Sequence, residues 1–241
     1  TRYLGLRHDL SHWTYGRAMT RLIDRHATAG LGCSEEATKA LFGRGWKADR
    51  RFRVFFCGID EAPFRIAIDA AKVRASVGVP ADAPTIGHVG RMAPQNNHAF
   101  LLEVFRAITR RRPDARLLLI GDGPLRPELE ARSRSLGLHD KIVWCGVRSD
   151  VPAVLRGAID VFVFPSLWEG LGLAVVEAQY AGRPCVISSV IAAEADVAPE
   201  LVSRIDLDAG AEQWAEVTLS RLRAAGAPAP SAPRSDRFDL A

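Results

Sequence analysis

The stretch FPSLWEGLGLAVVEAQYAG, residues 164–182, begins as the end of a buried strand and finishes as a helix. Two glutamates, Glu169 and Glu177, interrupt the apolar run, and Gly170-Leu171-Gly172 lies at the junction. Free backbone N–H groups at a helix N-terminus favour an anion, and glycines let a ligand approach the backbone closely. The stretch therefore predicts a strand–loop–helix unit with an anion-binding turn.

Short apolar runs and amphipathic segments alternate on both sides of this stretch. Such alternation is typical of βαβ units, in which parallel strands form a sheet covered by helices. We predict an α/β fold on this basis. The expected strands are 85–90, 115–121, 141–146, 160–166 and 184–188, and the expected helices are 97–111, 124–136, 150–157 and 171–181.

The N-terminal quarter contains two further strand-like runs, 26–34 and 51–58, with a helix capped at Ser34 between them. A connecting region, with a helix expected around 66–76 and a Pro/Ala/Asp-rich turn at 80–84, separates this quarter from the regular alternation. We predict an N-terminal part at 1–62, a linker at 63–84, a main domain at 85–215 and a flexible C-terminal tail at 216–241.

Composition restricts the class of protein. Hydrophobic residues make up 48% and charged residues 25%, values that argue against global disorder. The four cysteines lack zinc-ligand spacing, so we expect no metal. Neither a signal core nor a spanning segment is evident, and we expect a cytoplasmic protein.

Positive charge is concentrated near the N-terminus, where residues 1–60 hold eleven Lys/Arg against six Asp/Glu. This excess suits an anionic partner such as a membrane surface, a phosphorylated lipid or nucleic acid. A solvated arginine-rich face is the more common explanation of such an excess. Peripheral contact with the inner face of the membrane is therefore one open alternative.

Glycine-bearing turns follow four of the predicted strands, and the carboxyl ends of parallel strands meet at one edge where ligands bind. Arg91 and Arg148 lie in two of these turns, where a guanidinium can clamp a phosphate. Glu169 suits sugar hydroxyls, and Glu177 suits the two hydroxyls of a ribose. The alternative for each of these two arginines and two glutamates is a solvent-exposed side chain that binds no ligand.

Taken together, these motifs resemble the donor-binding domain of the retaining glycosyltransferases of family four. The opening stretch is similar to their signature of two glutamates separated by seven residues. VGRM (89–92), IGDGPLRPELE (120–130) and GVRSDVPAVL (146–155) resemble other landmarks of the family, and HAFLLEVF (98–105) resembles the branch that makes bacterial capsular and exopolysaccharides. The resemblance extends from near Ala27 to near Trp214.

The resemblance implies the two-domain GT-B fold, a Rossmann-like parallel sheet with helices on both faces, here with only part of a second domain. It also implies a nucleotide-sugar donor, a glycan or lipid-linked acceptor, and neither nucleic acid nor a cofactor. Glu169 and Arg91 match residues that act at the donor sugar and the leaving diphosphate. The matching donor-binding positions are Glu177, Gly90, Gly170, Leu171, Gly172, Leu173, Asn96 and Arg148.

Two positions depart from the family pattern. Asn96 stands where the family usually has a second cation, a lysine, and it can donate hydrogen bonds but carries no charge. Cys57 stands where an asparagine usually precedes Gly-Ile-Asp. Because preorganised donors commonly contribute about 10²–10³-fold each, either Arg148 compensates for the missing lysine or activity is reduced.

Three functions therefore stay open at this point. The first is sugar transfer from a nucleotide diphosphate with retention. The second is a catalytically incomplete nucleotide-sugar-binding module, favoured by Asn96 and by an N-terminal domain that resembles only a remnant of the family's acceptor domain. The third, an epimerase on the same fold, fits the paired glutamates less well.

Overall fold

The computed structural model of the chain describes residues 10–224. Its contacts divide the chain into two compact units, with the division between Gly58 and Ile59. The predicted tail at 216–241 lies partly outside the described residues. The two units are considered separately below.

The first unit is small. Its strands β1 (Gly30–Gly32) and β2 (Phe52–Val54) pair in parallel, with Gly30 opposite Phe52. They lie within the two predicted strand-like runs. The Ser34 hydroxyl accepts from the Ala37 N–H at 3.1 Å and caps helix α2 (Glu35–Phe42), as predicted. Helix α1 (Leu10–His26) was not predicted.

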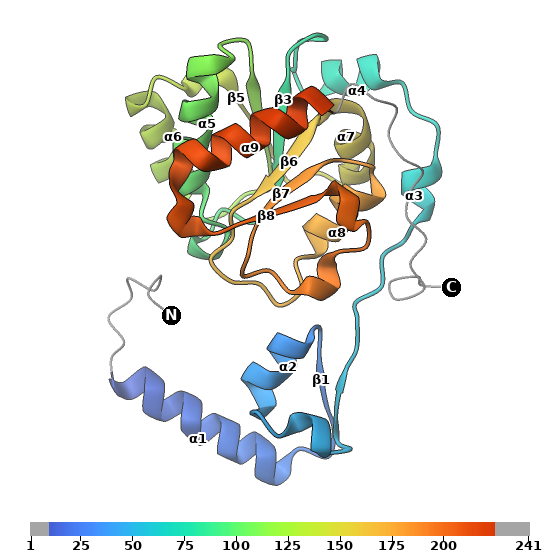
Figure 1. Cartoon of the computed structure of the whole chain (residues 1–241), viewed down its shortest axis with the longest axis vertical. Coiled ribbons are helices and arrows are strands. Elements are labelled where there is room, and N and C mark those ends of the chain that lie inside the picture. Colours follow the sequence, from blue (N-terminus) through green and yellow to red (C-terminus); the bar gives the residue numbers. More distant parts are fainter. Residues whose placement is uncertain (1–9, 225–241) are drawn as a thin grey trace. The chain divides into compact units, whose positions relative to one another are not determined.

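The second unit contains a six-stranded parallel sheet in the order β5-β4-β3-β6-β7-β8. The chain builds outward from β3 in one direction and then returns to build outward from β6 in the other (Figure 1). This is the Rossmann-like order, with its switch point between β3 and β6. The strands are β3 (Thr85–Val89), β4 (Arg116–Ile120), β5 (Ile142–Gly146), β6 (Val161–Phe164), β7 (Cys185–Ser188) and β8 (Val202–Ile205).

Helices cover both faces of this sheet, which confirms the predicted fold class (Figure 1). Helices α5, α6 and α9 pack on one face, and α7 and α8 on the other, with α3 and α4 against α7. Their bounds are α3 (Ala62–Arg65), α4 (Ala70–Ser76), α5 (His98–Arg111), α6 (Arg126–Ser135), α7 (Val151–Ala158), α8 (Leu173–Tyr180) and α9 (Gly210–Ala224).

The predicted strands and helices of the main domain are all present, with ends shifted by at most two residues. The structure differs from the sequence-based expectation in three places. Strand β8 was not predicted, helix α9 was not predicted and takes up residues 216–224 of the expected tail, and the expected linker 63–84 contains α3 beside α4, which lies within the helix expected around 66–76. Helix α4 forms there because the Asp69 carboxylate caps it, accepting from the N–H groups of Ala71 and Lys72. The domain boundaries remain predictions.

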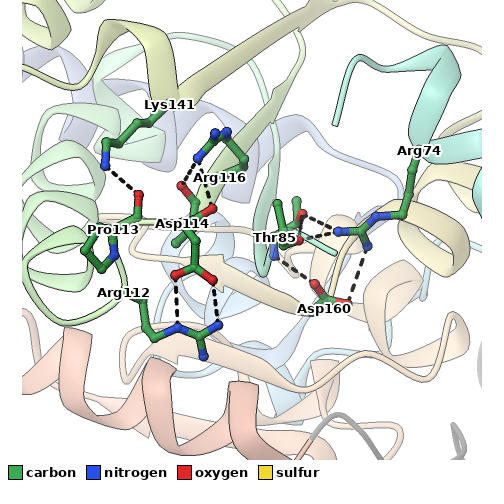
Figure 2. Close-up of polar contacts among 10 residues, drawn as sticks. Arg74, Thr85, Arg112, Pro113, Asp114, Arg116, Lys141 and Asp160 are labelled. Carbon is green, nitrogen blue, oxygen red and sulfur yellow. Dashed lines mark hydrogen bonds and ion pairs between the residues drawn. The ribbon is translucent and has the colours of Figure 1, made fainter. Parts of the chain in front are cut away.

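The amino-terminal ends of the central strands are fixed by charged side chains (Figure 2). Arg74 of α4 donates to the Thr85 hydroxyl at 3.0 Å and pairs with Asp160 at 3.7 Å. Asp160 in turn accepts from the Thr85 N–H at 2.8 Å. Because β3 begins at Thr85 and β6 just after Asp160, these contacts set the relative position of the two strands whose opposite ends carry the candidate site.

Candidate active site at the carboxyl ends of the strands

Strands β3 and β6 pair only at Ile86–Val161 and Gly87–Phe162, although both continue further. Beyond the last pair, the His88 ring bridges them, with its Nδ1 2.9 Å from the Val163 carbonyl oxygen. Ligands of open α/β sheets bind outside the carboxyl ends at such a switch point. The two loops that follow these strands, residues 90–97 and 165–172, carry most of the predicted site residues.

Arg91 lies in a firmly held loop. The Met92 N–H donates to the Asp122 carbonyl at 3.0 Å, which fixes this loop to the loop after β4. Gly121 has φ +126°, and a Cβ there would lie 2.2 Å from the Gly90 oxygen, so the close approach requires glycine. The Arg91 side chain is exposed and has no ion-pair partner among residues 10–224. Its backbone is fixed while its charge is available.

The N-terminus of α8 provides the predicted anion-binding turn. Gly172 is its N-cap, with φ +87° and no side-chain cap. Within the part of the chain that the structure describes, the backbone N–H groups of Leu171, Gly172 and Leu173 have no protein acceptor. The Leu171 side chain is buried, so this residue offers its backbone rather than its side chain to a ligand.

Glu169 and Glu177 are both half-buried rather than solvated. Glu169 lies beside the α8 N-terminus, since its Cγ is 3.9 Å from the position of a Cβ on Gly172. Burial raises its pKa, and hydrogen bonding by Gln95 and then Ser166 opposes that rise. Glu177 lies one helical turn beyond Leu173, and burial raises its pKa as well. A desolvated carboxylate beside unbonded amides, with a second one turn further along α8, indicates a binding site for a polar ligand.

Neither of the two side chains proposed to replace the missing lysine is available as predicted. Asn96 is only 7% exposed; its Nδ2 donates to the Arg91 carbonyl at 2.7 Å and its Oδ1 accepts from the Ser166 hydroxyl at 3.2 Å. Arg148 donates to both carboxylate oxygens of Asp150, at 2.8 and 2.7 Å, and this pairing raises the pKa of Arg148. Its charge is therefore largely neutralised by Asp150.

Sequence reasoning missed a pair of buried histidines beneath the loop that carries Arg91. His88 and His98 are at most 2% exposed, and their rings meet edge to face at 4.6 Å. Burial lowers the pKa of His88 to about 4; burial, and then the neighbouring His88, lowers that of His98 to about 2. A polar residue within the apolar run TIGHVG was the available signal.

These histidines predict acid sensitivity of the fold. The pKa of His98 in the folded protein lies below 6.5, the ordinary pKa of a histidine. Between these two values the unfolded state therefore binds more protons than the folded state. The free energy of unfolding falls as the pH drops from 6.5 toward the folded-state pKa. We expect the free energy of unfolding of the unmodified chain to fall about 2 kcal/mol more between pH 7 and 5 than that of His98→Phe.

Urea denaturation of both proteins at the two pH values measures this difference. The raised pKa values of Glu169 and Glu177 act in the opposite direction, since the folded state then binds more protons, but they do so in both proteins. Equal losses of stability in the two proteins would show that His98 is not buried in its neutral form.

A family model described as glycosyl transferases group 1 matches residues 83–218, which is more than half of the chain. The chain belongs to the group 1 glycosyltransferases. This confirms the resemblance to glycosyltransferases, and it places the loops 90–97 and 165–172 within the family domain. No helix in residues 10–224 has the length and apolar character needed to cross a membrane, and peripheral membrane contact remains a prediction.

Two named relatives and one solved structure illustrate the group 1 relationship. Glycosyltransferase EpsF of Bacillus subtilis is 39% identical over 86% of this chain and 54% of its own length. A UDP-Gal:alpha-D-GlcNAc-diphosphoundecaprenol alpha-1,3-galactosyltransferase of Escherichia coli is 34% identical over 55% of this chain and 35% of its own. Anabaena HepE in complex with UDP-glucose superposes with a TM-score of 0.79 at 24% identity, covering 96% of this chain and 66% of HepE, a likeness that shows the fold. The chain thus spans about half of EpsF and about a third of the galactosyltransferase.

Proposed function

We propose that this chain binds a nucleotide-diphosphate sugar at the carboxyl ends of β3 and β6 and serves its transfer, with retention of configuration, to a glycan or lipid-linked acceptor. The observation that carries the proposal is the turn 171–173, whose unbonded amides lie at a helix N-terminus next to the half-buried Glu169. An anion flanked by hydroxyls matches these groups, and a diphosphate sugar has both features.

Each group has a distinct proposed task. The diphosphate accepts from the amides of Leu171, Gly172 and Leu173 and pairs with Arg91, which stabilises the charge that grows on it as the sugar bond breaks. The Glu169 carboxylate accepts from hydroxyls of the donor sugar. The Glu177 carboxylate accepts from the two ribose hydroxyls.

The relatives indicate which ligands to test first. The name of the Escherichia coli relative specifies a UDP-activated galactose and a diphosphoundecaprenol-linked acceptor, and the HepE structure contains UDP-glucose. We therefore propose a UDP-sugar as donor and a lipid-linked saccharide as acceptor.

A second candidate function is donor binding without transfer. Two observations favour it: Asn96 is engaged inside the protein, and Arg148 is neutralised by Asp150. Arg91 would then be alone in stabilising the leaving diphosphate. Calorimetric titration with UDP- and GDP-sugars, combined with a hydrolysis assay, separates the candidates. Binding without turnover supports the second, and absence of binding contradicts both.

Glu177→Ala tests the site itself. Because hydrogen bonds to a charged group contribute about 1.5–3 kcal/mol each, we expect the substitution to weaken UDP-sugar binding about 10–100-fold. Glu128→Ala is the matched control, since Glu128 is an exposed helical glutamate on α6 with no ion pair among the described residues. Equal affinity of the two variants would contradict the assignment of Glu177 to the ribose.

A further inference from the structure

Three buried side chains connect the loops of the candidate site across three strands. The Asn96 Nδ2 donates to the Arg91 carbonyl at 2.7 Å, and the Ser166 hydroxyl donates to the Asn96 Oδ1 at 3.2 Å. Beyond β7, the Ser188 hydroxyl donates to the Ser166 carbonyl at 2.8 Å. Both serines are fully buried and Asn96 nearly so. These bonds run in an unbroken series from the peptide of Arg91 through β6 to β7.

Two further contacts fix the same two loops to each other. The Leu167 N–H donates to the Gln95 carbonyl at 2.8 Å, and the Asn97 Nδ2 donates to the Pro165 carbonyl at 3.2 Å. A side chain at Gly90 would displace the network, because its Cβ would lie 2.9 Å from the Asn96 Nδ2. The loop with the leaving-group arginine and the loop with the sugar-side carboxylate are thus one connected unit.

We infer that Asn96 is a positioning residue: it acts through Ser166 and the Arg91 peptide to hold Arg91 and Glu169 in register, and it does not contact the donor. This inference rests on the proposed function for the roles of Arg91 and Glu169. It accounts for an uncharged residue where the family usually has lysine, since both polar ends of the Asn96 amide have partners inside the protein. A buried amide left without these partners would be costly.

A double-mutant cycle separates positioning from direct contact. Residues that act through one network give non-additive effects, whereas independent contacts add. We expect Asn96→Ala and Ser166→Ala each to weaken UDP-glucose binding about tenfold and the double variant also about tenfold, rather than about a hundredfold. Ser189→Ala is the control, because this exposed serine follows β7 and bonds to Asp206 outside the network. Additive losses would overturn the inference.

A second readout does not depend on donor binding at all. The Ser166 hydroxyl has one hydrogen, which it donates to the Asn96 Oδ1. Hydrogen bonding by Ser166 also opposes the rise that burial causes in the pKa of Glu169. Removing the Asn96 side chain frees this hydrogen for Glu169, so Asn96→Ala should lower the pKa of Glu169, while Ser166→Ala should raise it. Titration of the Glu169 carboxyl carbon by 13C NMR, assigned with Glu169→Gln, measures both shifts.

The two readouts distinguish the possible failures. If the unmodified chain does not bind UDP-glucose, the proposed function fails, and the Glu169 titration still decides whether the network exists. Opposite shifts of the Glu169 pKa in the two variants support the positioning role, because a general loss of structure would not produce shifts of opposite sign. Unchanged or equal shifts in the two folded variants overturn it. Asn96→Lys adds one more test: tighter donor binding by this variant would contradict the inference.

Discussion

Arg91→Ala is expected to slow cleavage of a bound UDP-sugar about 10²–10³-fold, the usual effect of removing one preorganised donor from a developing negative charge. The structure explains why this side chain should matter more than Arg148. Arg91 is exposed, lacks an ion-pair partner among residues 10–224, and extends from a loop fixed by Asn96 and Asp122. Arg148 is paired with Asp150 instead.

UDP release from a UDP-sugar under single-turnover conditions measures this effect. Arg134→Ala is the control, because Arg134 is an exposed arginine on α6 without an ion pair in the described part of the chain. If the unmodified chain binds but does not turn over, the same variants are compared by their affinity for UDP, where we expect a loss of about tenfold or more. A rate and an affinity within twofold of the control would remove Arg91 from the site.

Trp214→Ala is expected to lower the free energy of unfolding by about 3–5 kcal/mol, as for other large core residues truncated to alanine. The Trp214 side chain is fully buried between α9 and the sheet, and Phe100 of α5 meets it edge to face at 5.7 Å. Its Nε1 also donates to the Asp206 carbonyl at 3.0 Å. The substitution therefore leaves a cavity and an unpaired carbonyl.

Urea denaturation monitored by circular dichroism measures this loss. Trp168→Ala is the control, since the Trp168 side chain is 41% exposed and its truncation should cost well under half as much. The loss of unfolding free energy for Trp214→Phe should lie between those of Trp214→Ala and Trp168→Ala, because phenylalanine keeps most of the packing but cannot donate to the Asp206 carbonyl. Similar stabilities for Trp214→Ala and Trp168→Ala would contradict the packing described for α9.

The sheet was predictable because strands buried on both faces produce continuous apolar runs. Runs such as RLLLI in β4 and VFVF in β6 stand out between polar helix faces. Strand β8 reads VSRI and lies at the sheet edge, so it lacks this signal. Helix α9 was not predicted either, and its last residues, 216–224, fell in the segment expected to be a tail.

The candidate site was predictable where its residues lie close together in sequence. The spacing of Glu169 and Glu177 and the glycines before α8 follow from one strand–loop–helix unit. The environment of Asn96 did not follow, because its partner Ser166 is seventy residues away and meets it only when β3 and β6 lie side by side. The pairing of Arg148 with Asp150 joins residues only two apart, so it could be predicted from the sequence.

Amide hydrogen exchange with and without UDP-glucose tests the central claim most directly. At saturating ligand, exchange should slow at Leu171, Gly172 and Leu173, whose N–H groups have no acceptor among residues 10–224. The amides of residues 81–83, which precede β3 at the opposite end of the sheet, should not change. Bound UDP-glucose that leaves the amides of 171–173 exchanging at their original rates would contradict the account.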